Sequence, residues 1–151
     1  MNLTETPEII RWPETHYIFI EKVGSFPVNA PAAWQEVNAL ASAVSAHNRI
    51  TGAFSLYKMG PEIYRAGFAL SAAPVELPTG LGYVKFAGGS YKRFVLTGSY
   101  SELGPATGRV WEMVAANGME VRDDYAIENY VTDPTTTPED QNVTEILVPT
   151  R

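Results

Sequence analysis

The pattern of hydrophobic and polar positions predicts the same succession of elements in both halves of the chain. The first half reads as a strand, a helix and two strands, over residues 16–24, 29–48, 51–59 and 62–72. The second half reads as two strand-like stretches, a helix and two strands, over residues 82–86, 91–100, 102–117, 125–131 and 143–148. Each half therefore contains the order β-α-β-β.

The predicted helices carry apolar residues at spacings of three and four, the mark of an amphipathic helix, as at Trp34, Val37, Leu40, Ala41 and Val44. A short internal echo supports a duplication, since FIEKVGSF at 19–26 is similar to FVLTGSY at 94–100, and each leads into a helix with a tryptophan. We expect one α+β domain with an antiparallel sheet and two helices. Repeat one spans about 12–75, repeat two about 81–149, and a ligand cleft is expected where the halves meet.

Composition narrows the class of function. The 151 residues carry a net charge of −6, which disfavours direct binding of nucleic acid, and no apolar run approaches the ~20 residues of a membrane helix. Cysteine is absent, which excludes disulfides and thiol chemistry. The polar first residues do not resemble a signal peptide, so we expect a cytoplasmic protein that does not bind membranes.

Most familiar catalytic motifs are missing. His16 and His47 are the only histidines, and neither lies in a zinc-binding or serine-triad pattern. The glycines match neither the dinucleotide-binding nor the phosphate-loop spacing. The sequence therefore predicts no catalytic residues, no metal and no cofactor.

Glu128 is the residue that stands out. It lies inside the predicted strand 125–131, where alternation places Ala126, Glu128 and Tyr130 on one face and Ile127 on the other. If Ile127 faces a helix-covered core, Glu128 is a solvated carboxylate. If the Glu128 face lines a cleft, the carboxylate requires a compensating cation or several hydrogen-bond donors.

Several residues of the second half, in order, carry a family resemblance: Gly88-Gly89-Ser90-Tyr91-Lys92-Arg93-Phe94, Gly98, Tyr100, Trp111, Ile127-Glu128-Asn129-Tyr130 and Thr144-Glu145-Ile146-Leu147-Val148-Pro149. They resemble the GyrI-like effector-binding family, the ligand-binding module of multidrug-responsive regulators of the BmrR and Rob type. The resemblance implies two β-α-β-β repeats related by a pseudo-twofold axis. Because only some eleven residues precede the first predicted strand, the chain is similar to stand-alone members.

The resemblance also implies a site. Glu128 corresponds to a strand glutamate that pairs with lipophilic cations among aromatic rings, and Tyr130 is expected to share its wall. The remaining candidates for ligand contact are Tyr91, Trp111, Trp34 and Tyr57. Tyr91 and Trp111 also match family positions with a structural role, so both roles stay open for them.

Three hypotheses follow. The first is binding of an amphipathic, cationic aromatic molecule without catalysis, because tyrosine and tryptophan offer flat apolar faces that attract cations. The second is hydrolysis of strained, cyclopropanoid-type compounds with Glu128 as general acid or base. The third is a protein-interaction module such as a gyrase inhibitor. A homodimer or a separate regulatory partner protein is left open.

Overall fold

The computed structural model describes residues 1–151 and divides them into two compact units. The first unit is Pro13–Gly88, and the second unit is formed by Met1–Trp12 together with Gly89–Arg151. Nine strands and three α-helices make up the chain, so the predicted α+β class is confirmed. None of the helices combines the length and the apolar character that crossing a bilayer requires.

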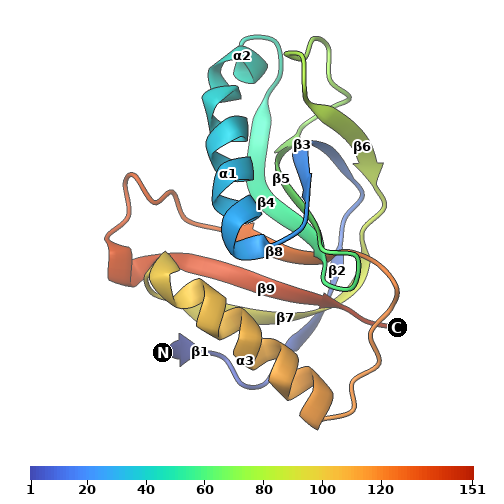
Figure 1. Ribbon diagram of the computed structural model, residues 1–151, viewed down its shortest axis with the longest axis vertical. Coiled ribbons are helices and arrows are strands. Elements are labelled where there is room, and N and C mark those ends of the chain that lie inside the picture. Colours follow the sequence, from blue (N-terminus) through green and yellow to red (C-terminus); the bar gives the residue numbers. More distant parts are fainter. The chain divides into compact units, whose positions relative to one another are not determined.

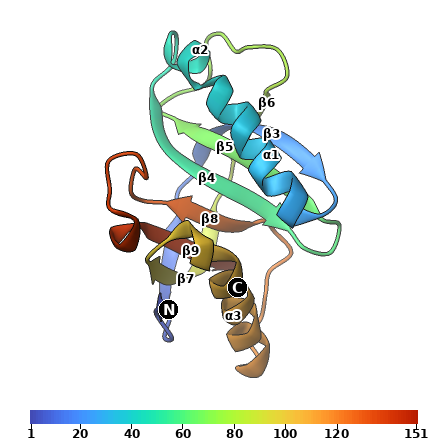
Figure 2. The same ribbon diagram turned by 60° about the vertical axis from the view of Figure 1, so that its left-hand side comes forward.

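The first unit is an antiparallel sheet covered by a helix. Its elements are β3 (Thr15–Val23), α1 (Phe26–Ala39), α2 (Ala41–Ser45), β4 (Ile50–Lys58), β5 (Ile63–Leu70) and β6 (Gly82–Phe86). The strands lie in the order β4-β5-β3-β6. Helix α1 packs against β3 and β5 (Figure 2), where it buries Ala33 and Val37.

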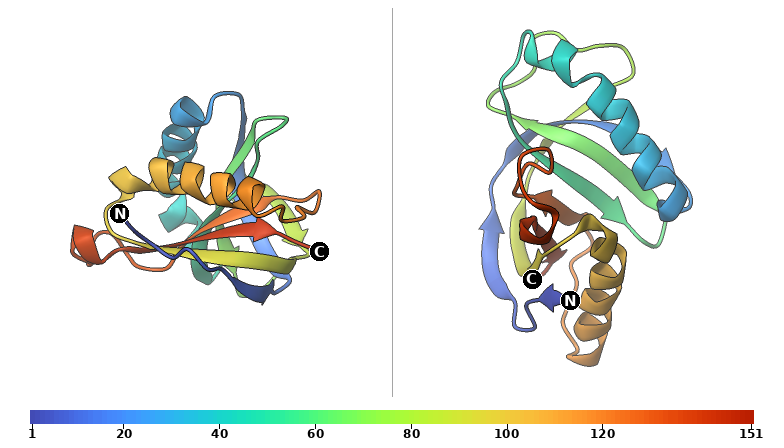
Figure 3. Two further views of the ribbon diagram at one scale, coloured as in Figure 1. Left: turned by 90° about the horizontal axis from the view of Figure 1, so that it is seen from below. Right: turned by 90° about the vertical axis from the view of Figure 1, so that its left-hand side faces the viewer.

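The second unit repeats this arrangement. Its elements are β1 (Asn2–Leu3), β2 (Glu8–Trp12), β7 (Gly89–Thr97), the 3-10 turn η1 (Tyr100–Glu102), α3 (Leu103–Ala116), β8 (Ala126–Tyr130), the 3-10 turn η2 (Glu139–Gln141) and β9 (Val143–Pro149). Strand β9 pairs with both β7 and β8, and the short strands β1 and β2 pair with β7. Helix α3 lies across β7 and β9 (Figures 1 and 3).

The order β-α-β-β therefore occurs in both units, as the hydrophobic pattern predicts. In each unit the last strand of the repeat is central, giving β3-β5-β4 in the first and β7-β9-β8 in the second. The sequence echo falls where β3 leads into α1 and where β7 leads into η1.

The core of the second unit lies between α3 and one face of its sheet. Four strand residues meet four helix residues there, namely Phe94, Leu96, Ile146 and Val148 with Ala106, Val110, Met113 and Val114. All are buried, and the helix residues recur at spacings of three and four. This packing fixes which face of β8 is turned toward α3.

Two features differ from the sequence expectation. Strand β6 pairs with β3 and belongs to the first unit, although its position in the chain suggested the second repeat. Gly88 and Gly89 both adopt positive φ, of 72° and 124°, so the chain changes direction between β6 and β7, where the sequence predicts two separate strand-like stretches. The residues before the first predicted strand also form β1 and β2, edge strands in which an exposed apolar residue, Ile9, stands next to the half-buried Ile10 and breaks the alternation.

Candidate functional site

Glu128 lies on the face of the second unit's sheet that α3 covers. Its register partner on β9 is Ile146, which pairs in turn with Phe94 on β7, and both belong to the core beneath α3. Ile127 pairs with Leu147 and points to the opposite face. The Glu128 side chain is therefore turned toward a helix, with only 9% of the residue exposed.

The Glu128 carboxylate has hydrogen-bond donors but no cation. The Thr107 hydroxyl of α3 donates to Oε2 at 2.8 Å, and the Tyr130 hydroxyl makes a long contact of 3.5 Å with Oε1. No lysine or arginine forms an ion pair with it. Burial raises the pKa of Glu128 above its usual value, and the two hydrogen bonds offset only part of that rise. The carboxylate is thus partly satisfied and electrostatically uncompensated.

Two further polar groups surround Tyr130. The Tyr100 ring of η1 meets the Tyr130 ring edge-on, with centroids 5.6 Å apart, and its buried hydroxyl has no hydrogen-bond partner in the protein. Thr144, the register partner of Tyr130 on β9, is fully buried, and its hydroxyl also lacks a partner. We refer to Tyr100, Thr107, Glu128, Tyr130 and Thr144 as the Glu128 cluster.

The Tyr100 hydroxyl keeps its proton at neutral pH, so it can donate a hydrogen bond. Burial, together with the nearby Asp133 carboxylate, raises the pKa of Tyr100 above its usual value of 10.0. The cluster therefore combines one carboxylate, which accepts hydrogen bonds, with several hydroxyls that can both donate and accept them.

Of the sequence-predicted site residues, the structure brings Glu128 and Tyr130 together directly. Trp111 lies on α3 one helical turn after Thr107, on the same stripe of the helix, and packs against the core beneath α3. Its position is compatible with both roles left open for it.

Tyr91 points to the other face of the sheet. Tyr91 is three residues from Phe94 along β7, and side chains an odd number of residues apart point to opposite faces of a strand. Its register partner is Pro149, so it does not share the face of Glu128. Its hydroxyl donates to the Tyr125 carbonyl at 2.8 Å, and the Arg122 guanidinium lies 5.2 Å from its ring centre. These contacts hold the segment that enters β8, which is a structural role.

Trp34 and Tyr57 belong to the first unit. The indole nitrogen of Trp34 donates to the Tyr64 hydroxyl at 2.8 Å, and the Tyr57 ring meets Phe26 edge-on at 5.9 Å. Contact between these two residues and a ligand remains a prediction.

Sequence reasoning missed Thr107, Thr144 and the direct role of Tyr100. Tyr100 was visible as the last residue of the echo, where Phe26 is its counterpart. Thr107 carried only a weak signal, its position four residues before Trp111 on the predicted helix. Nothing in the sequence marked Thr144.

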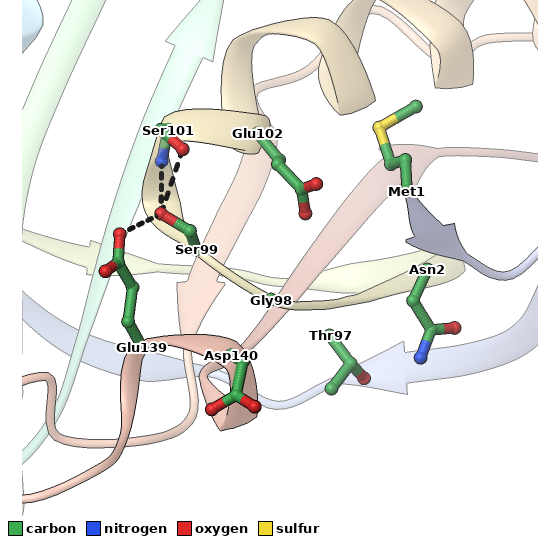
Figure 4. A pocket seen from close by; sticks show the side chains of 9 residues that line it. All are labelled: Met1, Asn2, Thr97, Gly98, Ser99, Ser101, Glu102, Glu139 and Asp140. Carbon is green, nitrogen blue, oxygen red and sulfur yellow. Dashed lines mark hydrogen bonds between the residues drawn. The ribbon is translucent and has the colours of Figure 1, made fainter.

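A separate open pocket of about 690 Å³ lies at the start of α3. Its lining is polar and acidic, from Met1, Asn2, Thr97, Gly98, Ser99, Ser101, Glu102, Glu139 and Asp140. Figure 4 shows Ser99 hydrogen-bonded to Ser101 and Glu139 at its wall. It does not include Glu128, and no group of three histidine or carboxylate side chains in the chain could hold a metal ion. Because it is open and its walls lack aromatic rings, it fits the predicted ligand poorly.

Several solved structures share the fold of this chain. The EcmrR C-terminal domain matches with a TM-score of 0.78 at 14% identity, over 99% of this chain and 98% of that one. SAV2435 bound to tetraphenylphosphonium matches with a TM-score of 0.72 at 12% identity, over 96% of this chain and 93% of that one. A hydrolase from Listeria innocua matches with a TM-score of 0.61 at 14% identity, over 97% of this chain and 92% of that one. At these identities the likeness shows the fold alone.

The longer EcmrR chain, seen in a complex with DNA, is matched over 57% of its length, so the likeness covers only part of that regulator. No curated protein matches the chain. The family comparison is decisive, because the model of the GyrI-like small molecule binding domain matches residues 5–151. The chain belongs to the GyrI-like family of small-molecule-binding domains.

Proposed function

We propose that the chain binds an amphipathic, aromatic cation at the Glu128 cluster. The observation that carries this proposal is a carboxylate that is 9% exposed, faces a helix and has no cationic partner. A buried charge of this kind is costly unless it is paired. A ligand cation would provide the missing partner.

The surroundings of Glu128 suit the rest of such a ligand. Tyr130, whose hydroxyl contacts the carboxylate, forms an edge-to-face pair with Tyr100, and aromatic faces attract cations by ~0.5–2 kcal/mol. Burial of ~200 Å² of apolar ligand surface would contribute about 5 kcal/mol. Added to a desolvated charge pair and reduced by the loss of ligand motion, this favours a dissociation constant of roughly micromolar order.

Two comparisons with known proteins support the proposal. The chain is a GyrI-like domain, and one protein of the same fold, SAV2435, has been solved with tetraphenylphosphonium, a lipophilic cation. Trp111 is the next candidate for the ligand wall, because it shares the stripe of Thr107 on α3.

The proposal is tested with Glu128→Gln and a matched pair of aromatic ligands, one cationic and one neutral, by quenching of tryptophan fluorescence. Loss of a charge-assisted hydrogen bond is worth ~1.5–3 kcal/mol, so we expect the cation to bind about 10- to 100-fold more weakly and the neutral ligand to change less than about threefold. Glu112→Gln is the control, because Glu112 is also on α3 but its side chain is 73% exposed. Equal weakening of both ligands would remove Glu128 from the proposed role.

A second candidate function rests on the same carboxylate. Burial raises the pKa of Glu128, and the Tyr130 hydroxyl lies beside it, which is an arrangement suited to a general acid with a polarising hydroxyl. One protein of the same fold is a hydrolase from Listeria innocua. Incubation with a cyclopropanoid compound, followed by mass spectrometry for addition of water, distinguishes turnover from binding. We expect any such activity to disappear in Glu128→Gln.

A further inference from the structure

The Glu128 cluster has a counterpart in the first unit. Across β4 and β5 Tyr57 pairs with Tyr64, as Tyr130 pairs with Thr144 across β8 and β9. Ser55 stands two residues before Tyr57, as Glu128 stands two residues before Tyr130. A ring at the start of the helix meets the strand tyrosine edge-on in both units, Phe26 at 5.9 Å and Tyr100 at 5.6 Å. Phe26, Trp34, Ser55, Tyr57 and Tyr64 form this counterpart cluster.

Three polar side chains of the counterpart cluster, Trp34, Ser55 and Tyr64, are hydrogen-bonded to one another. The Trp34 indole donates to the Tyr64 hydroxyl at 2.8 Å and to the Ser55 hydroxyl at 3.2 Å. The Ser55 and Tyr64 hydroxyls are 2.6 Å apart. Ser55 stands at the position that corresponds to Glu128. Besides Trp34, it has a second hydrogen-bonding partner in the Tyr64 hydroxyl, which the central strand β5 supplies.

The Glu128 cluster lacks that group. Thr144 stands where the first unit has Tyr64, and it forms no hydrogen bond through its hydroxyl. The Tyr100 hydroxyl is also without a partner, and Oε1 of Glu128 has only the contact of 3.5 Å with Tyr130. Each buried polar group left unpaired costs ~1–3 kcal/mol. Three under-satisfied groups around one tyrosine indicate a site that is completed by the ligand's own donors.

On the basis of the proposed function, we propose that the Glu128 cluster selects a protonated primary or secondary amine joined to an aromatic group, over a cation that has no N–H. An alkylammonium head carries two or three N–H donors. One can form a charge-assisted hydrogen bond with Glu128, and another can be accepted by a hydroxyl of the cluster. A quaternary ammonium or phosphonium ion pairs with Glu128 by charge alone and leaves the hydroxyls unpaired.

The test compares 2-(2-naphthyl)ethylamine with its N,N,N-trimethyl derivative on the unmodified protein at pH 7 by isothermal titration calorimetry. Both ligands are cations at this pH, because the amine titrates at about pH 10 and the quaternary nitrogen of its derivative carries a permanent charge. They share the ring and linker. We expect the amine to bind at least tenfold more tightly. Equal affinity, or tighter binding of the trimethyl derivative, overturns the inference.

Two variants assign the preference to named hydroxyls. Tyr100→Phe and Thr144→Val each remove one unpaired hydroxyl and keep the shape of the side chain, so each is expected to reduce the amine preference at least threefold while binding of the trimethyl derivative changes little. Tyr83→Phe is the control, because its hydroxyl is bonded to His16 in the first unit. An unchanged preference in both variants overturns the role of the hydroxyls, and folding of each variant is checked by circular dichroism.

The inference and the proposed function fail in different ways. If both cations bind equally and both are weakened by Glu128→Gln, cation binding stands and selection for N–H donors is wrong. If neither cation binds, both are wrong.

Discussion

Glu128 provides the charge that the proposed function requires, and burial of this charge without a cation is expected to lower the stability of the second unit. The carboxylate is buried on the helix-covered face and has one short hydrogen bond, from Thr107. Its mid-strand position and the family resemblance predicted the residue from sequence. Its partners could not be predicted in the same way, because Thr107 and Thr144 come from other elements that only the folded sheet brings beside it.

Glu128→Gln is expected to raise the free energy of unfolding by about 1 kcal/mol at neutral pH, as is common when a residue kept for function is replaced. The pKa of Glu128 is raised in the folded state, so folding holds its proton at a higher pH than the usual 4.5. The contribution of Glu128 to stability is therefore complete below about that value and is lost as the pH rises through the raised pKa. Urea unfolding at a series of pH values measures this, and a variant that is less stable at pH 7 would contradict it.

Thr107→Val should weaken the site in a pH-dependent manner. The Thr107 hydroxyl lowers the pKa of Glu128, so its removal lets burial raise that pKa further. Cation binding requires the ionised carboxylate, so the affinity falls as the pH is lowered through the pKa of Glu128. In the variant this fall should occur at a higher pH than in the unmodified protein. The affinity of one cationic dye across pH measures the shift. Thr107→Ser, which keeps the hydroxyl, should retain the original profile.

Strands and helices with a clear apolar pattern were predictable, and short edge strands were not. The helix at 102–117 and the strand at 143–148 appear as α3 and β9, because each buries a continuous stripe or face in the core. Strands β1 and β2 are two and five residues long, and their pairing with β7 joins residues that are 77 to 95 positions apart in the chain. No local pattern specifies such a pairing.

Gly67 on β5 is a position where the packing of strands excludes a side chain. A Cβ placed there would lie 2.1 Å from the Ile18 carbonyl oxygen of β3 and 2.6 Å from the Tyr17 ring. Gly67→Ala must therefore displace backbone, and we expect a loss of at least about 2 kcal/mol in the free energy of unfolding. Gly60→Ala is the matched control, because nothing lies within 4 Å of the added Cβ and little change is expected. Chemical denaturation of both variants measures the difference.

Considered as a whole, the molecule uses one architecture twice but carries the carboxylate once. The two units share the β-α-β-β order and an edge-to-face ring pair, while Ser55 stands in the first unit where Glu128 stands in the second. The hydrophobic pattern predicted the duplication because each repeat buries the same kinds of faces. It did not predict the difference between the two clusters, which depends on a few polar residues.

One cation should bind per chain, because only the second unit has a buried carboxylate at the corresponding position. Isothermal titration calorimetry measures this as a stoichiometry of one. A second equivalent that persists in Glu128→Gln would show that the Ser55 position also accepts cations.

The first unit is an insertion within the second, since Pro13–Gly88 lies in the chain between β2 and β7. During synthesis its four strands emerge from the ribosome as an unbroken stretch, before any of β7, β8 and β9. In each unit the central strand is made after its two neighbours, β5 after β3 and β4 and β9 after β7 and β8. The nascent chain can therefore acquire half of its architecture early, yet the proposed site at Glu128 is complete only when β9 has joined the sheet.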